Sequence, residues 1–224
     1  MPTHTLDQLT QRLLDWYDHL SWAIEFGALT PAVLAELAGG EPVAPERIAA
    51  RAGVPAAEVL DFLRASPAEW DADGRLVGLG LTLRPTAHRF EIHGRALYTW
   101  CAPDTLAFPV MLDATARVES PCFATGEPIR VELGPNGVRR VEPESAVVSV
   151  VTPQVGPADL RRYLCDNQHF FASPSAAAAW AAEHPDAMIV SVADGFTLTR
   201  RLLARWIASA RDSVGPLERE AAQT

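Results

Sequence analysis

The sequence predicts an α+β protein in which a winged-helix-like N-terminal domain precedes a small mixed-sheet α+β domain. Three observations support this prediction. Helical periodicity opens the chain, a hairpin pattern follows it, and short strands with turns fill the second half before two closing helices. We place the domains at residues 1–82 and 83–212, with a flexible polar tail at 213–224.

The first elements are expected to be helices. Apolar residues recur at helical spacing from Leu6 to Leu37, which predicts two or three helices. Residues 45–66 then predict two shorter helices, one on each side of Gly53. This pattern is typical of a helix-turn-helix.

A β-hairpin is expected next, over residues 71–92. Asp73 and Gly74 form a turn signal, and Leu79, Leu81 and Leu83 alternate with other residues as in one strand. Because helices followed by a hairpin are typical of a winged helix, we assign this architecture to the N-terminal domain.

Short strands with turns dominate the chain after Gly94. The alternation predicts strands at 117–119, 129–133 and 147–151, and one more at 188–192 between the two closing helices. This second half is therefore expected to be an α+β domain.

The two closing helices have recognisable first residues. Ser173 is the expected N-cap of the first, with Pro174 at its first position. The second is expected to open at Asp194. Its buried face would consist of Leu198, Leu202, Leu203 and Trp206.

Composition narrows the function classes. The 48% hydrophobic content is ordinary for a globular protein, and no apolar run is long enough for a membrane span or a signal peptide. We therefore expect a cytoplasmic protein without a membrane partner. The net charge of −9 argues against general nucleic-acid binding. All 19 basic residues are arginine, which we interpret as a genomic composition bias.

A winged helix raises the possibility of DNA reading. Its second short helix carries Glu58 and Asp61 against one cation, Arg64, whereas phosphate and base contacts both favour cations there. We therefore favour a winged helix that serves as a packing module, with no nucleic-acid partner.

Cys101 and Asp104 lie three residues apart in an otherwise apolar and aromatic stretch, LYTWCAPDTLAFP. Cys101 could be a small buried hydrophobe, the usual role of a free cysteine. With Pro103 at a first helical position, Asp104 could simply favour the helix dipole. A carboxyl beside an apolar pocket would instead have a raised pKa, as in a functional site.

Cys165 and Cys122 are the other two thiols of the chain. His169 follows Cys165 by four residues, which would place both on one face of a helix. A hydrogen-bonded core histidine, a zinc site from the three cysteines and His169, and a Cys–His–Asp acyl-transfer site are the generic interpretations. The spacing of the cysteines lacks the short pairs typical of zinc sites, and Cys122 is most simply a buried structural thiol.

Several segments together resemble the organomercurial (alkylmercury) lyase family. The resemblance is colinear from about Asp71 to Phe196 and is looser in the N-terminal helices. Its carriers are DADGRLVGLGLTLRPT (71–86), LYTWCAPDTLAFP (97–109), ARVESPCFATGEPI (116–129), VVSVVTP (147–153), LCDNQHFFAS (164–173) and IVSVADGF (189–196).

The resemblance implies a cofactor-free cleavage of a carbon–mercury bond, which gives a hydrocarbon and Hg(II), within a catalytic domain at 83–212. By the family pattern Cys101 and Cys165 bind the mercury of substrate and product. Asp104 lies at the metal as the proton donor, and Cys122 is a structural thiol. Hg(II) would then pass to small thiols or to a mercuric reductase.

The residue types suit this chemistry on independent grounds. Mercury is soft, so thiolate is its natural ligand. One thiolate captures the organomercury cation, a second weakens the mercury–carbon bond, and an adjacent acid protonates the carbon. An apolar setting favours the neutral acid and excludes water.

A hypothesis from another class is a non-catalytic protein that sequesters mercury or copper through Cys101 and Cys165. The family pattern leads us to expect a larger apolar residue at Pro103 and an apolar residue at Gln168. We expect these two differences to affect the reaction rate and the substrate range. Nearby aromatic residues either line a pocket for the organic group or pack in the core. These are Tyr98, Trp100, Phe108 and Phe170.

Overall fold

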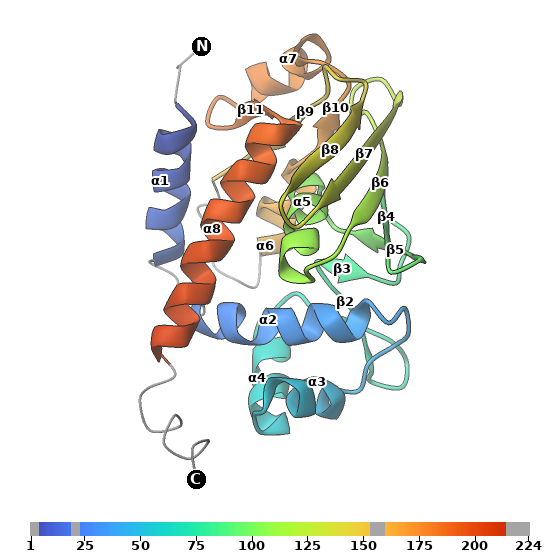
Figure 1. Cartoon of the computed structure of the whole chain (residues 1–224), viewed down its shortest axis with the longest axis vertical. Helices are drawn as coiled ribbons and strands as arrows, with labels where there is room; N and C mark the ends of the chain where they lie inside the picture. The colour runs from blue at the N-terminus through green and yellow to red at the C-terminus, as the bar shows by residue number, and fades with distance from the viewer. Residues whose placement is uncertain (1–4, 19–22, 153–159, 214–224) are drawn as a thin grey trace.

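The computed structural model describes residues 5–18, 23–152 and 160–213 (Figure 1). The helices are α1 (Leu6–Asp18), α2 (Ala23–Leu37), α3 (Pro45–Ala52), α4 (Ala56–Ala65), α5 (Ala102–Met111), α6 (Leu160–Tyr163), α7 (Pro174–Glu183) and α8 (Val192–Ser213), with a short 3-10 helix η2 (Cys165–Asn167). The strands are β1 (Glu69–Trp70), β2 (Leu76–Leu79), β3 (Leu81–Thr82), β4 (His88–Ile92), β5 (Arg95–Thr99), β6 (Ala116–Pro121), β7 (Pro128–Gly134), β8 (Gly137–Glu142), β9 (Val147–Val150), β10 (Phe170–Phe171) and β11 (Met188–Ser191).

The strands form two sheets. The larger has the order β1-β2-β3-β5-β4-β6-β7-β8 and the smaller the order β10-β9-β11. The α+β class is therefore confirmed, but the prediction of a mixed sheet is wrong, since every strand pair in the described ranges is antiparallel. Most neighbours in the large sheet follow each other through tight turns, which permit only antiparallel pairing.

Helix α5 occupies the centre of the molecule. It contacts α8 on one side and strands of both sheets on the other (Figure 1). Its Leu106 and Phe108 are buried in the core, against which α8 places Phe196 and Leu198. A residue at the start of α5 consequently lies between the two sheets and the long C-terminal helix.

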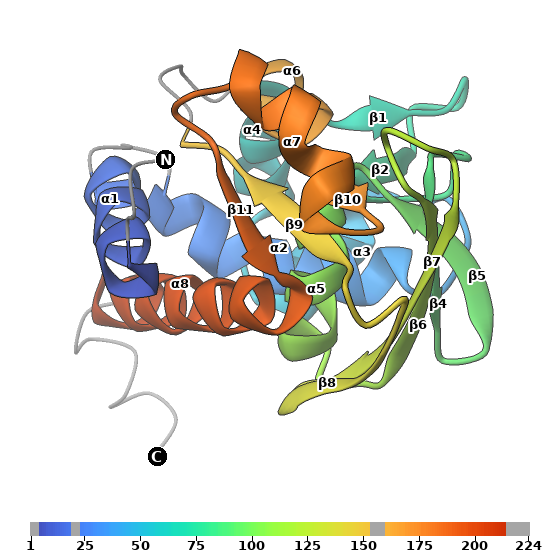
Figure 2. The same ribbon diagram turned by 90° about the horizontal axis from the view of Figure 1, so that it is seen from above.

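The N-terminal helices follow the sequence pattern. The two short helices separated by Gly53 are confirmed as α3 and α4, and Gly53 ends α3 in the left-handed conformation with φ +72°. The first predicted helical segment contains α1 and α2, with residues 19–22 outside the described chain. Helix α2 packs on α8, and α1 lies alongside α8 (Figure 2).

The expected single strand through Leu79 and Leu81 is wrong. The chain turns back at Gly80, whose φ is +73°, so that Leu79 in β2 pairs with Leu81 in β3. Period-two alternation does not reveal a turn whose flanking leucines are both buried. The predicted turn at Asp73-Gly74 is confirmed and joins β1 to β2.

The later elements agree with the predictions in position. The four expected strands correspond to β6, β7, β9 and β11, and Ser173 caps α7 by accepting a hydrogen bond from the Ala176 amide at 3.1 Å. Helix α8 begins at Val192 instead of Asp194, because the Ser191 hydroxyl caps it and accepts from the Asp194 amide. The Trp206 side chain and the tail beyond Ser213 lie outside the described residues.

The large sheet continues across the predicted domain boundary, since β3 pairs with β5. Among the described residues, none of the helices combines the length and apolar character that a membrane crossing requires.

Candidate active site

Three predicted side chains meet in one place. The Sγ atoms of Cys101 and Cys165 and a carboxylate oxygen of Asp104 lie within 4.8 Å of one another. Within the part of the chain that the structure describes, no other trio of Cys, His, Asp and Glu residues forms such a group. Both cysteines are buried free thiols.

The junction between β5 and α5 positions Cys101 and Asp104. Cys101 is the N-cap residue of α5, and its carbonyl accepts a hydrogen bond from the Thr99 hydroxyl at 3.0 Å. Asp104 follows in the first turn with Oδ2 buried and without a hydrogen-bond partner. Hydrogen bonds from the backbone amides of Cys101 and Trp100 lower the pKa of the same carboxyl, so a capping contact and a buried oxygen without a partner occur together at Asp104.

Cys165 reaches the site from a distant part of the chain. It opens η2 directly after α6, and the turn that follows fixes it to the start of α5. The Gln168 amide donates to the Cys165 carbonyl at 3.2 Å, and the Gln168 carbonyl accepts from the Ala102 amide at 3.2 Å. The two cysteine segments are therefore linked through one residue.

Burial dominates the ionisation of the site. It raises the pKa of Asp104 to about 6, against the lowering effects of the Cys101 thiol and backbone amide, the Arg161 guanidinium and the Trp100 amide. Burial also raises the pKa of Cys101 well above its ordinary value. The Cys101 thiol lowers the pKa of Cys165. Burial and the carboxyl groups of Asp104 and Asp166 have a larger combined effect in the opposite direction, and the pKa of Cys165 is raised overall. All three groups therefore favour their neutral forms more than they would in water.

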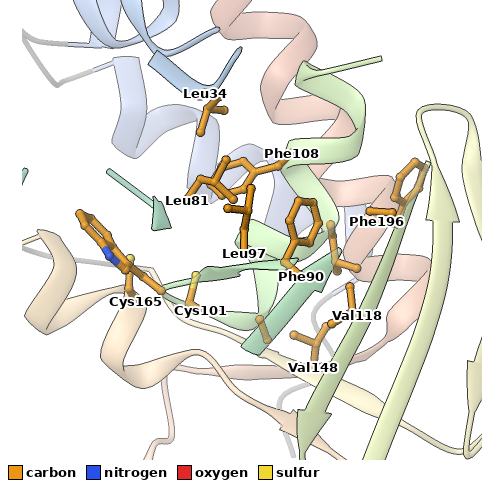
Figure 3. Packing of buried hydrophobic residues seen from close by; sticks show 14 of the residues in the cluster. Leu34, Leu81, Phe90, Leu97, Cys101, Phe108, Val118, Val148, Cys165 and Phe196 are labelled. Atoms are coloured by element: carbon orange, nitrogen blue, oxygen red, sulfur yellow. The ribbon is translucent and has the colours of Figure 1, made fainter. Parts of the chain in front are cut away.

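An apolar pocket of about 140 Å³ opens beside the thiols. Figure 3 shows Cys101 and Cys165 next to each other at one end of the buried hydrophobic cluster. Of the four aromatic residues for which both interpretations were open, Trp100 and Phe108 line this pocket, whereas Tyr98 and Phe170 are not among its lining residues. Helices α1, α2 and α8, from the two ends of the chain, also contribute to its wall, through Leu13, Thr30, Leu198, Leu202 and Leu203.

Gly80 is a site residue that the sequence analysis missed. A Cβ at this position would lie 2.8 Å from Phe108 Cζ and 3.7 Å from Asp104 Oδ2. The absence of a side chain lets the β2–β3 turn approach the carboxyl, and the positive φ is accessible to glycine. The glycine between two leucines was the available sequence signal.

Arg161 and Glu69 were also missed. Arg161 lies over the Trp100 ring at 4.5 Å and pairs with Glu69 Oε1 at 2.5 Å, while the other Glu69 oxygen accepts from the Thr82 hydroxyl. Arg161 and Glu69 are 92 positions apart in sequence, so no local pattern could reveal the pair.

Cys122 and His169 do not belong to the three-residue group, so the zinc and acyl-transfer hypotheses are wrong. The helical segment ends before His169, whose ring stacks on Phe123 with centroids 3.8 Å apart. Burial, with a smaller effect of His184, lowers the pKa of His169 to about 4, which makes it a poor base near neutral pH. Cys122 is buried, and its Sγ accepts a hydrogen bond from the Ala172 amide at 3.3 Å.

The arrangement has a defined chemical capacity. Metal–thiolate bonds are about 2.3 Å long for zinc, so two sulfurs within 4.8 Å of each other can hold one soft ion between them. A carboxyl of raised pKa beside the ion can accept and return a proton.

Comparisons with known proteins agree with this chemistry. The profile of the alkylmercury lyase family matches residues 81–204. Alkylmercury lyase of Staphylococcus epidermidis is 47% identical over 185 residues, which cover 82% of this chain and 85% of that protein. The alkylmercury lyase of Streptomyces lividans is 48% identical over 167 residues, which cover 74% of this chain and 77% of that protein.

A solved structure shares the fold. The mercury-bound form of MerB2 superimposes with a TM-score of 0.71 at 24% sequence identity, over 88% of this chain and 99% of that one. The arrangement of helices and sheets is thus common to both proteins.

Proposed function

The chain belongs to the alkylmercury lyase family, and we propose that Cys101, Cys165 and Asp104 carry out its cleavage of the carbon–mercury bond. The observation that carries this assignment is the meeting of two buried thiols with a carboxyl whose Oδ2 has no hydrogen-bond partner. Organomercury compounds are the substrates, and a hydrocarbon and Hg(II) are the products.

Capture of the substrate uses one thiol. The sulfur displaces the outgoing ligand of the organomercury compound, and the thiol proton leaves with that ligand. A metal-bound sulfur needs no proton, so mercury overcomes the raised pKa that burial gives the free thiols.

Cleavage uses the second thiol and Asp104. The carboxylate takes the second thiol proton, the resulting thiolate binds mercury, and the neutral carboxyl then protonates the carbon. The electron pair of the mercury–carbon bond forms the new carbon–hydrogen bond, which leaves Hg(II) between two sulfurs and restores the Asp104 carboxylate. Burial supports this step because it raises the pKa of Asp104 to about 6 and so favours its neutral form.

The pocket accommodates the organic group. Its volume of about 140 Å³ is similar to that of an apolar protein cavity of roughly 150 Å³ that binds benzene. A single aromatic ring fits this space, and the apolar wall favours it over water. Phenylmercury, whose organic group is a single aromatic ring, is therefore a suitable test substrate.

Other parts of the chain have supporting roles in this proposal. Cys122 is a structural thiol, the reaction uses no further cofactor, and Hg(II) passes to small thiols or a mercuric reductase. Helices α2 to α4 with the β1–β2 hairpin act as a winged-helix-like packing module. The boundary between this module and the catalytic part lies at residue 82, although one sheet extends through both. The protein acts in the cytoplasm.

The test mixes purified protein with phenylmercuric acetate and excess small thiol and follows the release of benzene. We expect many equivalents of benzene from the unaltered chain. Cys101→Ala, Cys165→Ala and Asp104→Ala should each abolish turnover, whereas Cys122→Ala, the matched thiol outside the site, should retain it.

Mercury binding separates the enzyme from a sequestering protein. Asp104→Ala should keep stoichiometric mercury uptake and lose benzene release, because both thiols remain. Uptake without benzene in the unaltered chain would refute the mechanism and leave a thiol-based metal-binding protein.

A further inference from the structure

Gln168 is a buried polar residue of the pocket to which the mechanism assigns no role. The residue is 4% exposed, and it lines the pocket beside both thiols. Burial of a side-chain amide costs free energy unless hydrogen bonds compensate. Its hydrogen-bond partners therefore indicate what it does.

The orientation of the Gln168 amide follows from its partners. Oε1 accepts a hydrogen bond from the Val151 backbone amide at 3.4 Å, and a backbone N–H requires an acceptor. The other atom of the terminal amide group, Nε2, consequently faces Cys101 Sγ at 3.9 Å. The structure thus places an N–H donor against one sulfur of the site.

The backbone of Gln168 strengthens this arrangement. Its amide donates to the Cys165 carbonyl and its carbonyl accepts from the Ala102 amide, each at 3.2 Å. One residue therefore joins the segments of both thiols while its side chain reaches Cys101. A displacement of Gln168 would change the separation of the two sulfurs.

A donor at Cys101 matters once that thiol has lost its proton. Cys101 is 1% exposed, so water does not solvate the anion, and the Asp104 carboxyl lies beside it. A hydrogen bond to a charged acceptor is roughly twice as strong as one to a neutral acceptor. The amide therefore gains most from the form of Cys101 that binds mercury.

We propose that Gln168 is a positioning residue, whose side-chain N–H holds the Cys101 sulfur, as thiolate, facing Cys165 across the substrate mercury. This proposal rests on the function assigned above to the two thiols. It concerns the placement of Cys101, and Gln168 itself forms no bond to mercury and transfers no proton.

Two variants remove the donor and keep the volume. Gln168→Met has similar length and no N–H, and Gln168→Glu is isosteric and keeps an acceptor for the Val151 amide. Asn167→Ala is the matched control, because that amide bonds the carbonyls of Arg162 and Tyr163. Thermal melting followed by circular dichroism checks that each variant is folded.

The first measurement uses no mercury. In a Cys165→Ser background, a dipyridyl disulfide reacts with Cys101, and peptide mass spectrometry separates this product from labelled Cys122. We expect the Cys101 rate to fall about 5- to 10-fold in both Gln168 variants, because a charge-assisted hydrogen bond is lost, and to stay unchanged in Asn167→Ala. A merely structural role predicts the opposite, since a loosened site is more accessible and reacts faster.

The second measurement is steady-state cleavage of phenylmercury with both cysteines present. We expect kcat to fall by a similar factor while KM changes less than about 2-fold, since the organic pocket is intact. Unchanged or faster reaction of Cys101 in both folded variants would overturn the proposal. If the unaltered chain released no benzene, the proposed function would fail instead, and the Cys101 rates would still decide whether Gln168 holds the sulfur.

Discussion

The position of Asp104 favours a role in catalysis and disfavours the stability of the folded protein. In the first turn of a helix an ionised carboxylate is normally favoured, because the free amides attract negative charge. Here burial outweighs that effect, and the Oδ2 atom has no partner. The fold therefore maintains an ionisable group whose charged form it disfavours, as is common where function requires it.

This conflict predicts that Asp104→Asn stabilises the protein in a pH-dependent manner. The pKa rises from 3.8 in the unfolded chain to about 6 in the folded one, so the folded state is penalised as pH increases through that window. We expect no gain near pH 3, a growing gain between pH 4 and 6, and a maximum of about 3 kcal/mol at neutral pH, at 1.36 kcal/mol per pKa unit.

Urea unfolding of both proteins between pH 4 and 8 measures this gain. Asp166→Asn is the control, because that carboxyl is on the neighbouring turn and is exposed. Equal stability of Asp104→Asn and the unaltered chain at neutral pH would show that the carboxyl is solvated in the folded protein.

The site residues differ in how far sequence could reveal them. Cys101 and Asp104 are sequence neighbours on one helix start, so their proximity was predictable from spacing. Cys165 joins them only through the tertiary structure, and the family resemblance, not its spacing, identified it. Gln168 was noted for its unexpected polarity, yet its contact with Cys101 depends on where Val151 places an N–H group.

At the scale of elements, an ion pair ties α6 to the strands. Arg161 on α6 pairs with Glu69 on β1, and Glu69 also accepts from Thr82 on β3. The Glu69 side chain is only 10% exposed, so it depends on its partners for compensation of its charge. This contact fixes the turn from which Cys165 projects.

A double-mutant cycle tests this contact. Arg161→Gln should destabilise the protein by about 1–3 kcal/mol because it leaves a mostly buried carboxylate unpaired, and Glu69→Gln in the same chain should recover part of the loss. Arg162→Gln is the matched control, because that side chain is exposed and lies over Tyr163 at 5.4 Å. Additive effects of the two substitutions would refute the coupling.

Elements that a local sequence pattern specifies were predictable, whereas features that depend on which strands pair with each other were not. Helices α3 and α4 and the cap of α7 followed from periodicity, Gly53 and Ser173. The turn at Gly80 was hidden, because the residues on both sides of it are buried. Strand direction was also mispredicted, because it depends on which segments meet and not on the pattern of any one of them.

At the scale of the whole molecule, both ends of the described chain close the pocket. Helix α1 lies alongside α8, where Asp7 pairs with Arg201 at 2.6 Å (Figures 1 and 2). Leu13 of α1 and Leu203 of α8 line the pocket that reaches the thiols. The organic group of the substrate would therefore contact segments far in sequence from the cysteines.

Two leucines of α1 separate this role from simple packing. Leu9 and Leu13 are 1% and 4% exposed, but only Leu13 lines the pocket. Each substitution by alanine should cost about 2–3 kcal/mol of stability, because a buried side chain is lost. Only Leu13→Ala should raise KM for phenylmercury, by about 5-fold, since roughly 1 kcal/mol of apolar contact with the ring disappears.

Steady-state kinetics well below the melting temperature measure this difference, and kcat should stay nearly constant because the thiols and Asp104 are untouched. If both variants had the same KM, α1 would be a cover over the core, and the organic group would be bound by α5 and α8 alone.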